Sequence, residues 1–153
     1  MKKLILFCCS ALTVMVPAAW SEGLTALDYA EIQQLYAKYN YAIDSGDGEA
    51  YAATFIPEGE FNTFKGHEAL KGFIKNYTEN MNGAMRRHWN TNLLIEGDGK
   101  TAQAKVYLML MELNTTPPSI GITAVYNDSL IKTADGWRFS KRATVGDPKP
   151  AAQ

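Results

Sequence analysis

The stretch 101–113, which reads TAQAKVYLMLMEL, decides the fold class. Every second residue from position 102 to position 110 is apolar, which predicts a β-strand with one face packed on a core. The opposite face begins polar but ends in Tyr107, Met109 and Met111, so the second half of the strand is apolar on both faces. That second face could line a cavity or form a subunit contact, and we favour a homodimer through the outer face of the sheet.

The segments that follow and precede this stretch continue the period of two. Strands are predicted over 87–96, 120–132 and 137–144, with turns at 97–99 and 133–136 and a loop at 114–119. Long strands that follow one another through short connections form an antiparallel meander. The sequence therefore predicts a sheet built from the second half of the chain.

The first part of the chain has helical spacing instead. Thr25, followed three residues later by Asp28, marks a helix start, and apolar residues then recur at helical spacing as far as Gly46. Helices are predicted over 26–45, 48–55 and 67–81, with a turn at 57–59 and a short strand at 60–64. The order α-α-β-α-β-β-β-β indicates an α+β domain, in which three helices against one curved sheet leave a cavity suited to a small molecule.

The N-terminus has the pattern of a secretory signal. Two lysines precede an apolar run from Leu4 to Val16, which is too short to span a bilayer, and small residues follow as far as Ser21. We expect cleavage after Ser21; an uncleaved anchor or a buried N-terminal helix is the alternative. The predicted organisation is a signal peptide at 1–21, a domain at 22–146 and a disordered tail at 147–153, in a periplasmic or secreted protein with no membrane contact after cleavage.

Composition limits the chemistry that this domain can perform. The whole chain has 153 residues, two cysteines, two histidines and a net charge of −1. Without residues 1–21 it keeps 13 basic residues against 16 acidic ones, a net charge of −3, and no cysteine. We therefore expect no nucleic-acid partner, no disulfide and no thiol chemistry. Two histidines exclude a three-histidine zinc site, and we expect neither a metal nor a cofactor.

Two polar positions could carry chemistry. His88 shares one face of its predicted strand with Asn90 and Asn92, which forms either a solvent-facing row or one wall of a pocket. Asp44 ends the first helix off its apolar stripe, so spacing alone favours an exposed acid, although it could lean over a cavity mouth. Asn127 lies between apolar residues of its strand, which predicts a buried, paired amide.

Several motifs in order resemble the SnoaL-like branch of the nuclear transport factor 2-like superfamily. They are the YAIDSGD run at 41–47, the PEG turn at 57–59, GHEAL at 66–70, Arg87-His88 with Asn92, YND at 126–128 and GWRF at 136–139. The resemblance covers residues 25–145. It implies a cone-shaped curved antiparallel sheet wrapped by three helices around a deep pocket, often in a dimer.

The nearest functional pattern resembles scytalone dehydratase. Asp44, His88 and Asn127 stand at its Asp, His and Asn positions, whereas Ile43 and Thr63 replace its two tyrosines and positions 109–111 offer no second histidine. The resemblance implies that His88 acts as general acid and base with Asp44 as its orienting partner. Ligand contacts are then expected from Asn127, Asn92, Tyr39, Tyr51, Phe55, Trp89, Tyr107 and Met109.

Three functions are compatible with these residues. The first is a cofactor-free lyase or isomerase for a small, largely apolar carbonyl compound. The second is a non-catalytic exported binding module for a small hydrophobic or aromatic ligand. The third is a structural dimer with a vestigial pocket. The partner that we expect is a small molecule.

Overall fold

A computed structural model describes residues 23–148 of the chain. The predicted signal peptide and the end of the predicted tail lie outside the described residues. The elements, in order, are α1 (Ala26–Ser45), α2 (Gly48–Ala52), β1 (Phe55–Phe61), β2 (Phe64–Lys65), α3 (His67–Asn80), β3 (Arg86–Gly97), β4 (Thr101–Glu112), β5 (Ser119–Thr133) and β6 (Gly136–Gly146).

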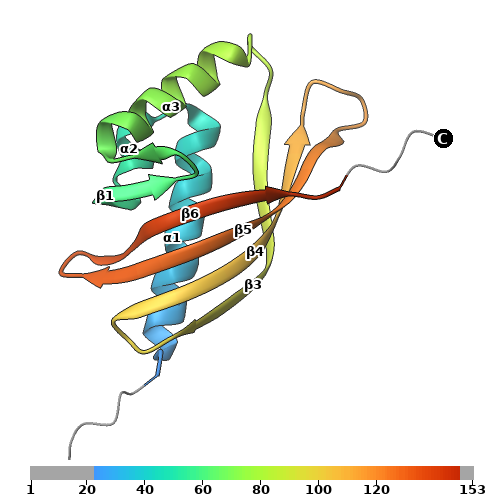
Figure 1. Cartoon of the computed structure of the whole chain (residues 1–153). Helices are drawn as coiled ribbons and strands as arrows, with labels where there is room; N and C mark the ends of the chain where they lie inside the picture. The colour runs from blue at the N-terminus through green and yellow to red at the C-terminus, as the bar shows by residue number, and fades with distance from the viewer. Residues whose placement is uncertain (1–22, 149–153) are drawn as a thin grey trace, which may run out of the picture.

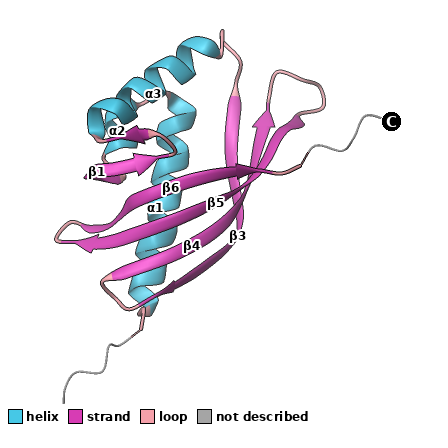
Figure 2. Cartoon of the chain, viewed as in Figure 1, coloured by secondary structure: helices cyan, strands magenta, loops and turns pink. Residues whose placement is uncertain are grey.

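The strands form one curved six-stranded sheet in the order β2-β1-β6-β5-β4-β3. The last four strands are the predicted antiparallel meander. α1 crosses one face of the sheet and α2 and α3 gather at one end of it, while the opposite face carries no helix of the described chain (Figures 1 and 2). The predicted α+β class with three N-terminal helices on a curved sheet is confirmed.

The sheet is mixed, which corrects the expectation of a wholly antiparallel sheet. β1 runs parallel to β6 and pairs with it through Phe55 and Phe61. The turn predicted at 57–59 was wrong, because these residues lie within β1 where its register with β6 shifts. An irregular stretch tolerates the missing N–H of Pro57. The predicted second helix also ends earlier, at Ala52.

α1 is held at its N-terminus by one buried carboxylate. Asp28 closes a capping box with Thr25, whose backbone N–H and hydroxyl both donate to it. The same carboxylate accepts from Nε1 of Trp137 at 2.9 Å and from Nζ of Lys132 at 2.6 Å. Asp28 therefore fastens the start of the helix to the β5–β6 hairpin.

Asp28 should make the fold sensitive to acid. The hydrogen bonds from Lys132 and Thr25 hold the pKa of Asp28 well below its ordinary value of 3.8. A carboxylate whose pKa is lowered by folding stabilises the folded state. This stabilisation is complete at pH values above 3.8 and is lost progressively as the pH falls below 3.8 toward the lowered pKa. Asp28→Asn should lower the free energy of unfolding at pH 7 by about 1–3 kcal/mol.

Urea unfolding between pH 7 and pH 2 checks this prediction. The difference between wild type and Asp28→Asn should shrink as the pH falls below 3.8. Asp135→Asn, which changes an exposed carboxylate in the β5–β6 turn, is the matched control and should stay close to wild type. A difference that stays constant over this range would contradict the role given to Asp28.

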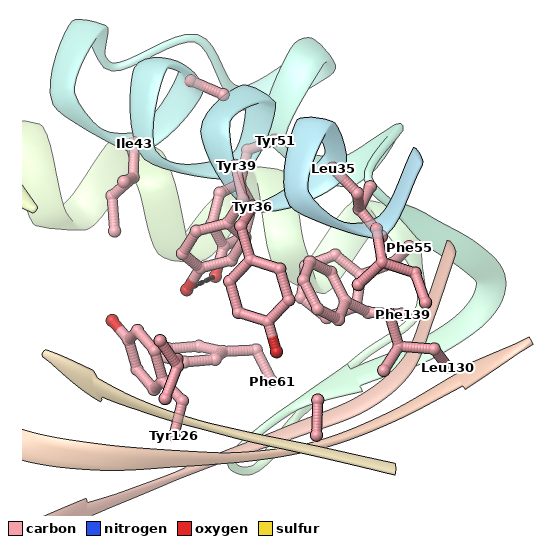
Figure 3. Close-up of a cluster of buried hydrophobic side chains, with 14 of the residues drawn as sticks. Leu35, Tyr36, Tyr39, Ile43, Tyr51, Phe55, Phe61, Tyr126, Leu130 and Phe139 are labelled. Atoms are coloured by element: carbon pink, nitrogen blue, oxygen red, sulfur yellow. Dashed lines mark hydrogen bonds between the residues drawn. The ribbon is translucent and has the colours of Figure 1, made fainter. Parts of the chain in front are cut away.

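The core between α1 and the sheet encloses a buried ion pair. Arg142 donates to both carboxylate oxygens of Asp128, at 2.8 and 2.7 Å, and both side chains are wholly buried. The Tyr36 hydroxyl also donates to Asp128. Four aromatic rings surround the guanidinium at 4.1–4.7 Å, those of Tyr36, Tyr39, Tyr126 and Phe139. Figure 3 shows these rings reaching from α1 and the sheet toward one another.

None of the helices in the described part of the chain is both long and apolar enough to cross a membrane.

Candidate functional site

Asp44 and His88 form a hydrogen-bonded pair between the end of α1 and the start of β3. Nδ1 of His88 lies 2.7 Å from Oδ1 of Asp44, and the backbone N–H of His88 donates to the same carboxylate at 3.2 Å. Only 5% of the histidine side chain and 10% of the aspartate side chain are exposed. The fold therefore brings together, in a sheltered place, the two residues expected to carry the chemistry.

This contact decides which ring nitrogen of a neutral His88 carries the proton. A carboxylate only accepts hydrogen bonds, so Nδ1 is the donor and Nε2 keeps its lone pair. Among the described residues, Nε2 has no hydrogen-bond partner. An imidazole oriented in this way can take a proton from a ligand at Nε2 and return it.

Asp44 occupies a position in α1 that is unfavourable for a negatively charged side chain. It lies in the last turn of α1, which contains no basic residue. The partial negative charge at a helix C-terminus disfavours a nearby carboxylate by about 0.3–1 kcal/mol. The two donors of His88 offset this cost. A residue that breaks a local rule yet is buried and paired is typical of a functional position.

α3 places Tyr77 next to the pair. Its ring centroid lies 6.2 Å from that of His88, and its buried hydroxyl has no hydrogen-bond partner among the described residues. Burial raises the pKa of Tyr77, while the guanidinium of Arg86 opposes this rise. The hydroxyl is therefore a neutral donor. Tyr77 is not among the residues predicted for the site, because it recurs at helical spacing with the apolar residues Phe73 and Ile74 of α3. Its hydroxyl was the available signal.

The predicted polar row on β3 ends earlier than expected. His88 and Asn90 face α1, but Asn92 is exposed and has a φ of 56°. The register with β4 shifts at this point, so Leu93 and Ile95 return to the core. A bulge adds one residue and reverses the alternation. Asn92 therefore lies at the bulge and is exposed, and it does not continue the inward-facing row of His88 and Asn90.

Four predicted ligand contacts lie on the outer face of the sheet, away from His88. Trp89 alternates with the inward-facing His88, pairs with Met109 across the β3–β4 ladder, and is 53% exposed. The buried residues of β4 and β5 have even numbers, so Tyr107, Met109 and Asn127 point the other way. The structure does not bring these four residues to the Asp44–His88 pair.

The three remaining predicted contacts lie inside the domain. Tyr39, Tyr51 and Phe55 are buried, and the hydroxyls of Tyr39 and Tyr51 are 3.0 Å apart (Figure 3). Burial raises the pKa of both tyrosines, so both remain neutral at ordinary pH. Ring contacts continue from Tyr51 through Phe73 to Tyr77. A continuous series of aromatic ring contacts thus connects the core to His88.

Within residues 23–148, no three His, Cys, Asp or Glu side chains are grouped so that they could hold a metal ion. The arrangement of Asp44, His88 and Tyr77 suits proton transfer and hydrogen bonding to a carbonyl oxygen.

Comparison with known proteins supports this interpretation of the fold. Residues 24–143 match the family model of the SnoaL-like domain. No curated protein was found that matches the chain. Many solved structures are similar to the chain, and three of them are compared with it by sequence identity, coverage and TM-score.

A protein from Catenulispora acidiphila, solved in complex with S-DNPA, is 31% identical, with a TM-score of 0.73; the match covers 80% of this chain and 96% of that one. A Mycobacterium tuberculosis protein of unknown function is 28% identical, with a TM-score of 0.73 and coverage of 79% and 72%. An NTF2-like protein with a cystatin-like fold from Novosphingobium aromaticivorans is 25% identical, with a TM-score of 0.70 and coverage of 77% and 80%.

Proposed function

The chain belongs to the family of SnoaL-like domains, and from that membership we propose that it is an exported small-molecule pocket protein that acts as a cofactor-independent lyase or isomerase on a small, largely apolar carbonyl compound. The observation that carries this proposal is the largely buried contact of 2.7 Å between Nδ1 of His88 and Oδ1 of Asp44. A relative solved with a small ligand adds support for binding of a small molecule.

The reaction begins at the carbon next to the carbonyl. Nε2 of His88 removes a proton from that carbon, and the electron pair of the broken C–H bond moves into an enolate. Tyr77 donates a hydrogen bond to the developing oxyanion, and Asp44 stabilises the imidazolium through Nδ1–H. In an isomerisation, His88 returns the proton to another carbon. In an elimination, it gives the proton to a β-hydroxyl, which leaves as water.

A panel of carbonyl compounds tests the proposal. β-Hydroxy ketones and β,γ-unsaturated ketones with an aromatic or alicyclic body are incubated with the purified domain, and formation of the conjugated enone is followed by absorbance. We expect turnover of at least one member of the panel. A ligand-dependent rise in Tm without turnover of any member would contradict catalysis and support the alternative function.

The alternative is a non-catalytic periplasmic binding module for a small hydrophobic or aromatic ligand. One observation favours it. Ile43 and Thr63 stand where the scytalone dehydratase pattern has tyrosines, and Thr63 is exposed in the turn between β1 and β2. The site then holds fewer hydroxyl donors than that pattern, which suits binding without catalysis.

Export to the periplasm or the medium forms part of the proposal. It is supported by the short cationic start and the apolar run from Leu4 to Val16. Intact-mass measurement on protein recovered from the exported fraction checks it. The proposal expects a chain that begins at Glu22, whereas a mass that includes residues 1–21 would contradict it.

We also propose that two copies pair through the outer face of the sheet. Trp89, Tyr107 and Val145 are each more than half exposed there, and Met109 and Val125 lie between them in the ladders. Contiguous apolar residues on an exposed face are typical of a contact between subunits. One face that meets a copy of itself gives a symmetric dimer.

Sedimentation of the purified domain tests the dimer. Tyr107→Glu places a charge at the centre of the face and should convert the dimer to a monomer at micromolar concentration. Leu27→Glu, which changes an exposed apolar residue on α1, should leave the dimer intact. A wild-type domain that sediments as a monomer, or a dimer that survives Tyr107→Glu, would contradict the proposal.

A further inference from the structure

A cleft opens between α1 and the edge strand β3, where Asn40 precedes Asp44 by one helical turn and Asn90 follows His88 by two residues. Its volume is about 320 Å³, and neither Asp44 nor His88 lines it. α1 packs against β3 along this side of the domain (Figure 1). The lining residues are Gln33, Tyr36, Ala37, Asn40, Asn90, Thr91, Asn92, Leu93 and Val106. This volume reaches the lower end of the range of about 300–1,000 Å³ that is usual for small-molecule sites.

No side chain that lines this cleft is charged. A charged ligand would therefore lose its hydration without gaining a counter-ion, so the cleft favours a neutral occupant. Ala37, Leu93 and Val106 supply apolar surface, whereas the amides supply directional hydrogen bonds. This combination suits a small ligand with one polar end and an apolar body.

Two amides in the cleft hold polar atoms without partners. Oδ1 of Asn40 and both Oδ1 and Nδ2 of Asn90 are buried and have no hydrogen-bond partner among the described residues. Unpaired polar atoms destabilise a fold, and all three belong to residues that line the same cleft, so a ligand that forms hydrogen bonds with them would stabilise this region. The set consists of one donor group and two acceptor oxygens.

We propose that this cleft is a binding site for the primary carboxamide group of a neutral ligand. The carbonyl oxygen of a carboxamide accepts from Nδ2 of Asn90. Its NH₂ group carries two hydrogens, one for Oδ1 of Asn90 and one for Oδ1 of Asn40. A ketone lacks the two donors and a carboxylate adds a charge, so neither completes the set. This proposal does not depend on catalysis at His88.

Titration of the ¹⁵N-labelled domain with benzamide, acetophenone and sodium benzoate tests the proposal. Benzamide should shift the side-chain NH₂ signals of Asn90 and the backbone signals of Ala37 and Leu93. The affinity for benzamide should exceed the affinities for acetophenone and benzoate at least about tenfold, because each of these two probes leaves polar atoms of the cleft unpaired. Equal affinities for the three probes, or shifts confined to His88 and Tyr77, would overturn the proposal.

Variants separate a binding role of the amides from a structural one. Asn90→Leu and Asn40→Leu should each weaken benzamide binding at least about tenfold while Tm stays equal or rises, because an apolar side chain replaces unpaired polar atoms. Asn127→Leu, on the outer face, is the matched control and should bind benzamide as wild type does. A fall in Tm for Asn90→Leu, or unchanged binding by both variants, would overturn the proposal.

Discussion

Replacing His88 by alanine is expected to lower kcat for a carbonyl substrate by about 10²–10⁴-fold, the usual contribution of a general acid or base. The physical reason is that, in the proposed mechanism, Nε2 of His88 moves the proton while Nδ1 stays 2.7 Å from Oδ1 of Asp44. Steady-state kinetics on the best substrate of the panel measure this effect. KM should change much less than kcat, because the lost group acts mainly in the transition state.

Two further variants make this prediction specific. His88→Gln keeps an N–H group that can donate to Asp44 but removes the imidazole. This variant should fold, and its kcat should fall as far as that of His88→Ala. Asp44→Asn should lower kcat in the same direction, because the amide stabilises the imidazolium less than a carboxylate does. His67→Ala removes the other histidine, which contacts the carbonyl of Phe55, and should keep wild-type kcat. Activity that survives in His88→Gln would contradict acid–base catalysis by this residue.

The largest expected loss of stability comes from the buried ion pair. Asp128→Ala should lower the free energy of unfolding by about 3–5 kcal/mol, because it leaves the wholly buried guanidinium of Arg142 without its counter-ion. The surrounding aromatic rings offset only part of this loss, since cation–π contacts contribute about 2 kcal/mol when desolvated. Urea denaturation followed by tryptophan fluorescence measures the change.

A double substitution tests whether the loss arises from an unpaired charge. Asp128→Leu combined with Arg142→Met removes both charges and should recover most of the stability that either single substitution loses. Glu79→Ala breaks an exposed pair with Lys75 and should cost less than about 1 kcal/mol. If Asp128→Ala costs no more than Glu79→Ala, the core does not depend on the ion pair.

The helices and the meander could be predicted because their periods are regular. The helix predicted over 26–45 matches α1, since its capping box and its glycine at position 46 are both local signals. β2 and the parallel pairing of β1 with β6 could not be predicted in this way. β1 contains a proline and a register shift, and its partner lies at the far end of the chain.

The site was predictable only in part, for two reasons. The bulge at Asn92 depends on a positive φ that asparagine tolerates but does not require, so alternation alone extended the polar row one residue too far. The burial of Asp128 and Arg142 was not predicted either. A charged side chain is buried only when it is paired, and the pairing of these two depends on the register between β5 and β6, which spacing along the chain does not give. Resemblance to a family, rather than spacing, gave the expectation that Asp44 faces inward, and its side chain is only 10% exposed beside His88.

A crystal structure of the domain with a tightly bound carbonyl compound from the panel tests acid–base catalysis by His88 most directly. The ligand should lie against Tyr77, and the carbon that loses its proton, or the oxygen that receives it, should lie about 3 Å from Nε2 of His88. Nδ1 of His88 should still contact Asp44. A ligand bound on the outer face of the sheet, or a His88 ring turned away from the ligand, would contradict the role proposed for His88.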